Sequence, residues 1–84
     1  MRKKREIVQM PQLSQEVASQ IVVDFLKKQK NTEKIEVMFA EIQDNFWVVT
    51  GTSPIQFGDG QWPERFTVVV DSKGKIRSST FRLL

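Results

Sequence analysis

The 84-residue sequence predicts an α+β fold, in which one N-terminal helix packs on a four-stranded antiparallel sheet in meander order. Three observations lead to this prediction. Apolar residues between positions 13 and 31 recur at helical spacing, the residues after position 34 alternate with a period of two, and short turn sequences separate the alternating segments. A chain of this length forms a single core, so residues 13–84 are expected to be one domain behind a basic, poorly ordered segment, residues 1–12.

The helix is predicted to run from Leu13 to Asn31. Ser14 is placed to cap its N-terminus, and Asn31 suits the left-handed conformation that ends a helix. Lysines in the last turn complement the helix macrodipole. The apolar stripe has members three or four residues apart: Leu13, Val17, Ala18, Ile21, Val22, Phe25 and Leu26.

The first hairpin is predicted from strands Lys34–Gln43 and Phe46–Thr52, joined by the two-residue turn Asp44-Asn45. With this turn, Ile42 lies opposite Trp47. One face then carries Met38, Ala40, Ile42, Trp47 and Val49, and the other carries Ile35, Val37, Phe39, Phe46 and Val48. Both faces are apolar, so the pattern leaves open which face meets the helix.

The second hairpin is predicted from strands Arg65–Asp71 and Lys75–Leu83. Its turn contains Gly74, which suits a left-handed position. The expected pairs on the face toward the helix are Val70 with Ile76, Val68 with Ser78, and Phe66 with Thr80. The reverse face, expected to lie in water, carries Arg65, Thr67, Val69, Lys75, Arg77, Ser79 and Phe81.

Between the hairpins, Ser53–Pro63 is expected to be a loop, because it contains two glycines and two prolines. Ile55, Phe57 and Trp62 are unusually apolar for a water-facing loop. They either fold back as a plug on the end of the core or anchor a partner. We expect the plug, in which case Trp62→Ala would cost about 3–5 kcal/mol of folding stability.

The composition argues against most catalytic chemistry, because the sequence has no histidine, cysteine or tyrosine. The usual general base, thiol nucleophile and transition-metal ligands are therefore missing. An enzyme built from this chain would depend on a buried carboxyl group, for which Asp24 and Glu41 are the two candidates. We expect no catalytic residue, no metal site and no cofactor.

Charge is concentrated at the start of the chain. Four of the 13 Lys and Arg residues lie at positions 2–5, which leaves nine basic residues against 10 Asp and Glu. No apolar segment follows the basic start, as a secretory signal requires, and no run approaches the length of a membrane span. We therefore expect a cytoplasmic protein that does not contact a membrane.

The stretch "RFTVVVDSKGKI", residues 65–76, is similar to the final hairpin of a PepSY-like domain. The order of elements also resembles cystatin-like domains, in which a meander wraps a helix. This resemblance implies a non-catalytic binding or regulatory module. The Gln-x-Val-x-Gly motif of cystatins is missing at Trp47–Gly51, so protease inhibition is not implied, and no functional residue is carried over from either family.

The sequence thus predicts an interaction module that binds a protein, an apolar ligand or a second copy of itself. The candidate binding residues are Ile35, Phe39, Val48, Phe57 and Trp62. An alternative is nucleic-acid binding through the basic N-terminal segment and the second hairpin, with candidate contacts Arg65, Lys75, Arg77 and Arg82. A small carboxylate-dependent enzyme is a third alternative.

Overall fold

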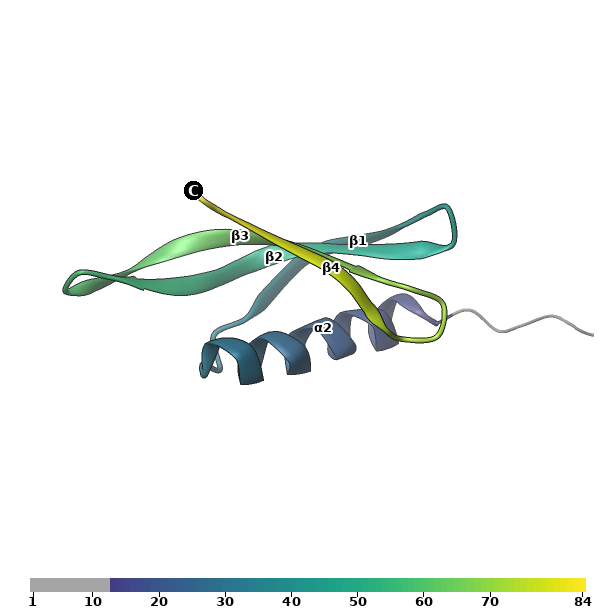
Figure 1. The fold of residues 1–84 in the computed structure, drawn as a ribbon, viewed down its shortest axis with the longest axis horizontal. Coiled ribbons are helices and arrows are strands. Elements are labelled where there is room, and N and C mark those ends of the chain that lie inside the picture. The colour runs from purple at the N-terminus through teal and green to yellow at the C-terminus, as the bar shows by residue number, and fades with distance from the viewer. Residues whose placement is uncertain (1–12) are drawn as a thin grey trace, which may run out of the picture.

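The computed structural model describes residues 13–84 as one helix and four strands: α2 (Gln15–Lys30), β1 (Glu36–Gln43), β2 (Phe46–Phe57), β3 (Gly60–Val70) and β4 (Ile76–Leu83). The strands pair antiparallel in sequence order, so the predicted α+β meander is confirmed. Figure 1 shows α2 lying along one face of the sheet. The expectation that residues 1–12 are poorly ordered lies outside the described residues.

Both ends of α2 are set by the residues that the sequence indicated. The Ser14 hydroxyl oxygen accepts a hydrogen bond from the Val17 backbone N–H at 3.1 Å. Asn31 has a φ of 53°, in the left-handed region, and its backbone N–H donates to the Lys27 carbonyl. The helix is slightly rotated from the predicted stripe, because Ala18, Val22 and Leu26 are fully buried whereas Val17 is exposed.

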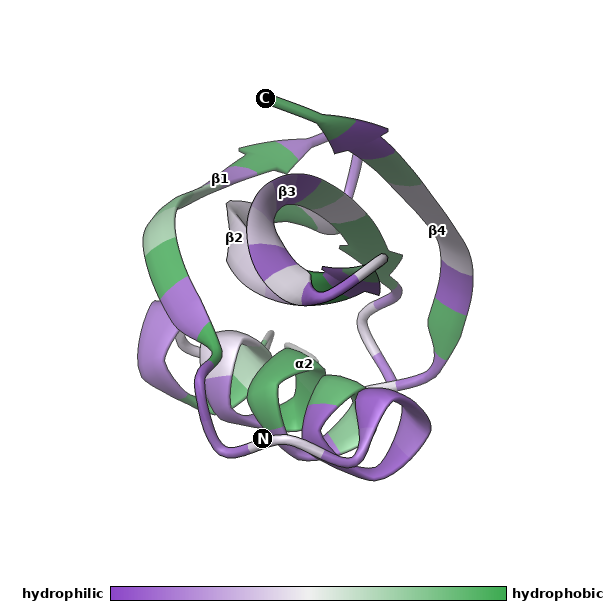
Figure 2. Ribbon diagram, turned by 90° about the vertical axis from the view of Figure 1, so that its left-hand side faces the viewer, coloured by the Kyte–Doolittle hydropathy of each residue, from purple (hydrophilic) through white to green (hydrophobic). Residues whose placement is uncertain are grey.

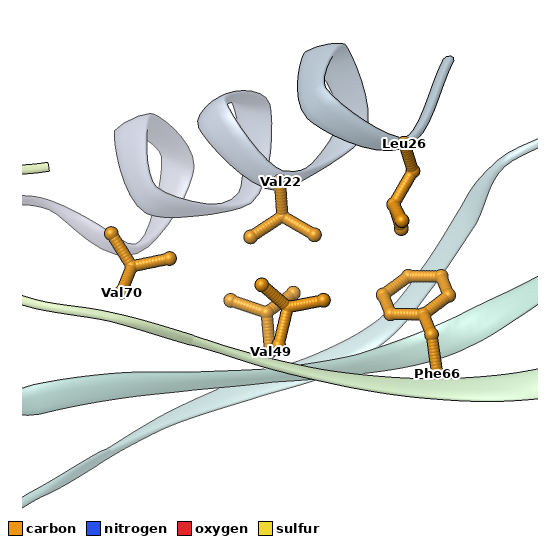
Figure 3. Packing of buried hydrophobic residues seen from close by; sticks show 6 residues of the cluster. Val22, Leu26, Val49, Phe66 and Val70 are labelled. Carbon is orange, nitrogen blue, oxygen red and sulfur yellow. The ribbon is translucent and has the colours of Figure 1, made fainter. Parts of the chain in front are cut away.

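The core lies between α2 and the two central strands. Figure 3 shows Val22 and Leu26 pointing from the helix toward Val49, Phe66 and Val70 on the sheet. These side chains are fully shielded from solvent, and burying each contributes about 1.5–3 kcal/mol. In Figure 2, the hydrophobic side of α2 faces the sheet, while β1 and β4 lie to either side of the β2–β3 ribbon.

The first hairpin confirms the predicted turn and the Ile42–Trp47 pair but contains a bulge. Asp44 and Asn45 have φ values of 52° and 71°, as a two-residue hairpin turn requires. An extra residue, Met38, shifts the register between Val37 and Phe39.

Because of this bulge, neither predicted face of the first hairpin exists intact. The residues of β1 and β2 that pack on the core come from both predicted faces: Val37, Ala40, Trp47 and Val49. The Trp47 indole N–H also donates to the Leu13 carbonyl at 2.8 Å.

The loop predicted over Ser53–Pro63 is wrong. Strands β2 and β3 pair without interruption as far as Phe57 and Gly60, and the two-residue turn Gly58-Asp59 joins them. The resulting ribbon extends past the C-terminal end of α2 (Figure 1). We call residues 54–63 the arm. Trp62 is 55% exposed, so the expectation that it plugs the end of the core is also wrong.

The second hairpin differs from the predicted register by one residue. Val70 pairs with Ile76 as expected, but a bulge after this pair places Ser78 opposite Val69 and Phe81 opposite Phe66. The expected pairs of Val68 with Ser78 and of Phe66 with Thr80 are therefore wrong. Phe81 packs against the core rather than on the wet face. Gly74 adopts the predicted left-handed conformation, with a φ of 87°.

Candidate functional site

The arm begins at a pair of prolines. Pro54 and Pro63 lie directly opposite each other in the β2–β3 ladder. Since neither residue has an N–H to donate, their backbone groups must point outward, away from the partner strand. β1 begins opposite Thr52 and β4 ends opposite Glu64, so the prolines fall just beyond both outer strands. The sheet therefore changes from four strands to two at this pair.

One face of the arm is apolar and uncovered. Ile55 pairs with Trp62, so their side chains project from the same face, and Phe57 projects from that face at the next alternate position. This face continues the surface that carries Phe66 in the core, but α2 ends at Lys30 and does not reach it. Phe57 and Trp62 are 60% and 55% exposed.

The arm is also nearly free of charge, since Asp59 is the one charged residue among its ten. Charged residues make up 27% of the whole chain. Depletion of charge together with enrichment of aromatic residues is typical of the centre of a protein interface. The composition of the arm therefore favours contact with another polypeptide.

A hollow of 540 Å³ lies at the base of the arm. Residues 33–36, between α2 and β1, form one side, and residues 52–54 and 61–63 of the ribbon form the other. Ile35 and Trp62 are apolar parts of its lining. Ser53, also in the lining, is almost completely buried, and its hydroxyl has no hydrogen-bond partner.

A buried ion pair closes the core next to the arm. Glu64 is 6% exposed, and its carboxylate lies 2.5 Å from the Lys30 ammonium at the end of α2. The Lys30 nitrogen is also 4.6 Å from the centre of the Phe81 ring, a cation–π contact. The burial of Glu64 could not be predicted from the sequence, because its partner is 34 residues away along the chain. This carboxylate is paired and structural.

The five candidate binding residues fall on two different faces. Ile35 and Trp62 line the hollow, and Phe57 lies farther out on the same face of the arm. Phe39 and Val48 lie on the other side of the sheet, at positions opposite Thr50 and Glu41. The structure therefore brings three of the five residues together, and those three define the candidate site.

The four candidate basic residues also separate into two pairs. Arg65 and Arg82 lie directly opposite each other on β3 and β4. Lys75 and Arg77 lie near the start of β4, and Arg77 contacts the Asp71 carboxylate at 3.4 Å. Arg77 and Arg82 are five positions apart, a distance of about 16 Å along a strand.

The two carboxyl groups considered for catalysis do not form a site. Asp24 is exposed on α2 and accepts a hydrogen bond from the Gln20 side chain at 2.9 Å. Glu41 is exposed on β1. Within residues 13–84, no three metal-ligating side chains gather at one point.

The pKa of the Asp71 carboxyl group is lowered from its ordinary value. The backbone N–H of Lys75 donates to it at 2.9 Å and has the largest lowering effect on its pKa. Burial opposes this effect, while the Lys73 N–H and the Arg77 guanidinium lower the pKa further. These contacts fix the β3–β4 turn, so the role of Asp71 is structural.

The arm, its hollow and the Arg65–Arg82 pair are thus features of residues 13–84 that packing leaves without an explanation. The helix that these residues form is not long and apolar enough to cross a membrane. We found no significant match to this chain among protein-family models, curated proteins or solved structures, so the PepSY-like and cystatin-like resemblance stays a prediction.

Proposed function

We propose that this chain is a non-catalytic interaction module that binds a second copy of itself through the arm. The observation that carries the proposal is the apolar face of the arm, formed by the exposed Phe57 and Trp62 and the half-buried Ile55. Isolated exposed apolar residues are common on protein surfaces, but a ribbon that extends two aromatic rings beyond its own core needs a partner surface. A cytoplasmic location remains the expectation from the sequence.

The charge distribution favours a copy of the chain over a charged partner. One acidic residue, Glu6, precedes residue 13, as do four basic residues, so residues 13–84 carry nine groups of each sign. Two neutral bodies meet without net repulsion, and a nearly uncharged arm offers no complementary field to a strongly charged protein. A two-fold dimer also covers the apolar face by using the same patch twice.

The hollow at the base of the arm suggests how two copies fit. In a two-fold arrangement with antiparallel arms, the tip of each arm lies at the base of the other. Phe57, near the tip, then enters the partner's hollow beside Ile35 and Trp62. This arrangement covers the exposed aromatic rings of both copies.

Sedimentation equilibrium over a wide concentration range tests the proposal. The wild-type chain should form dimers, and Phe57→Ala or Trp62→Ala should weaken dimerisation by about 2 kcal/mol, or roughly thirtyfold, as truncated interface hot spots do. Met38→Ala is the matched control, because Met38 is 53% exposed but lies on β1 away from the arm. It should leave the dimer unchanged.

Two results would contradict the proposal. A chain that stays monomeric at the highest concentration would show that the arm does not mediate self-association. A dimer that Met38→Ala weakens as much as Trp62→Ala does would place the interface elsewhere.

Fluorescence gives an independent measurement of dimer formation. In a Trp47→Phe variant Trp62 is the remaining tryptophan, and its emission should shift to the blue as dimers form.

A further inference from the structure

Arg65 and Arg82 form a pair of like charges that packing does not require. They are directly opposite on neighbouring strands, where β-carbons lie about 4.5–5.5 Å apart and like charges destabilise the sheet. Both side chains are exposed. No carboxylate of residues 13–84 lies within ion-pair distance of either guanidinium group.

Protection of a sheet edge does not explain this pair. Basic residues on an edge strand prevent association between sheets, and β4 is such a strand. β3, however, is an interior strand that pairs with both β2 and β4. Edge protection accounts for Arg82 but gives no reason for Arg65 to lie beside it.

The surroundings of the two arginines provide further hydrogen-bond donors and no acid. A hollow of 350 Å³ between them is also lined by Phe81 and by the hydroxyl-bearing Thr67 and Thr80. Guanidinium and hydroxyl groups together are suited to the oxygens of a phosphate group.

A strip with no carboxylate before Asp71 continues from this hollow along the sheet. β4 contains no acidic residue, and neither does β3 between Glu64 and Asp71. Arg77 lies at the far end of the strip, about 16 Å from Arg82, where it contacts the Asp71 carboxylate, and Lys75 lies two positions beyond it. The acidic residues Glu36 and Glu41 lie on β1, at the opposite edge of the sheet.

We propose that the β3–β4 strip binds the sugar–phosphate backbone of a single-stranded nucleic acid, with one phosphate group held between Arg65 and Arg82. The linear arrangement favours an extended polyanion over a single small anion, because two further exposed basic residues, Arg77 and Lys75, lie farther along the chain from Arg82. The acidic edge at β1 directs the strand along β3 and β4. This site is separate from the apolar face of the arm.

Fluorescence anisotropy with a labelled single-stranded oligouridine tests this site on the full chain. Arg65→Gln/Arg82→Gln should weaken binding by about tenfold at low salt and reduce the slope of log affinity against log salt by about 0.7, the value for one phosphate contact on a single strand. The control Lys28→Gln/Lys34→Gln removes the same charge from two exposed positions outside β3 and β4 and should change binding less than twofold.

Unfolding by urea provides a second measurement. Arg65→Gln/Arg82→Gln should unfold at the same or a higher urea concentration than wild type, because the substitution removes repulsion across the β3–β4 ladder. A lower midpoint would show that the arginines stabilise the fold, and it would overturn the proposal.

Three binding results would also overturn the proposal: no binding at low salt, equal losses in the control and the arginine variant, or equal affinity for inorganic polyphosphate. The second of these would assign the affinity to net charge, including the basic residues near the start of the chain. The third would show a site for polyanions in general.

Discussion

The Lys30–Glu64 pair should behave as a buried ion pair, with a strong penalty when one partner is removed. The exposed fractions of the two side chains are 18% and 8%. Removing one partner of a buried pair costs about 3–5 kcal/mol, because the remaining charge stays in a poorly solvated place. For Lys30→Met we expect the lower end, about 3 kcal/mol, since the Lys30 side chain retains some contact with water.

The reverse substitution should cost less. In Glu64→Leu the remaining charge is the Lys30 ammonium, which is on a flexible chain and can move outward to water. We therefore expect a loss of about 1–2 kcal/mol from removing this hydrogen-bonded charge. The double variant Lys30→Met/Glu64→Leu should lie within about 1 kcal/mol of wild type, because apolar side chains of similar size replace both charges.

Urea unfolding of wild type, the two single variants and the double variant at neutral pH completes a double-mutant cycle. We expect a coupling energy of about 2 kcal/mol or more between Lys30 and Glu64. If Lys30→Met costs less than about 1 kcal/mol and the coupling is close to zero, the pair is solvated like a surface ion pair. That result would refute the conclusion that it closes the core.

Three further predictions concern the backbone, the arm and the β3–β4 turn. Gly51→Ala should destabilise the fold by about 3 kcal/mol, because a β-carbon there would lie 2.0 Å from the Glu36 carbonyl oxygen and 2.5 Å from the Phe66 ring. Gly60→Ala, with open space around the added atom, is the control and should cost less than about 1 kcal/mol in the same urea titration. Trp62→Ala should lower the stability of the monomer by only about 1 kcal/mol, because more than half of this side chain is already exposed, and a loss of 3 kcal/mol or more in dilute solution would show that the ring is buried. The lowered pKa of Asp71 means that its carboxylate stabilises the fold above the unfolded pKa of about 3.9, and this contribution disappears as the pH falls through the folded value. The difference in urea midpoint between wild type and Asp71→Asn should therefore shrink in acid, and a difference that stayed constant there would argue against this linkage.

The parts of the fold that depend on local chemistry could be predicted from the sequence. Ser14 and Asn31 end the helix through contacts with residues three or four positions away. Asn45 and Gly74 form turns because their own conformations allow a positive φ. In each case the residues that determine the structure are close together in the chain.

The two bulges could not be predicted in this way. An extra residue at Met38 leaves the alternation of β1 looking regular, yet it moves Val37 into the core and leaves Phe39 on the other face. The bulge in the second hairpin likewise turns Phe81 inward. Which residue is left unpaired depends on packing between distant segments, so the predicted faces, and with them the candidate site, were only partly right.

The arm was missed for a different reason. Gly58-Asp59 between two segments containing apolar residues is itself a signal for a two-residue hairpin. The two prolines, Pro54 and Pro63, led instead to the prediction of a loop, since proline usually interrupts a strand. Their effect depends on pairing: Pro54 faces Pro63, at a position that needs no hydrogen bond between the two strands. A single sequence does not show this pairing.

The proline pair also divides the chain into two parts that can vary independently. Beyond it, each arm residue pairs with a residue of the same hairpin, so equal numbers of residues can be removed at the tip from both strands without changing any other pair. A deletion in one strand alone would shift every cross-strand partner between the deletion and the turn. The length of the arm, and the hydrophobic or charged character of its side chains, can therefore change while the core of Val22, Leu26 and Phe66 stays the same.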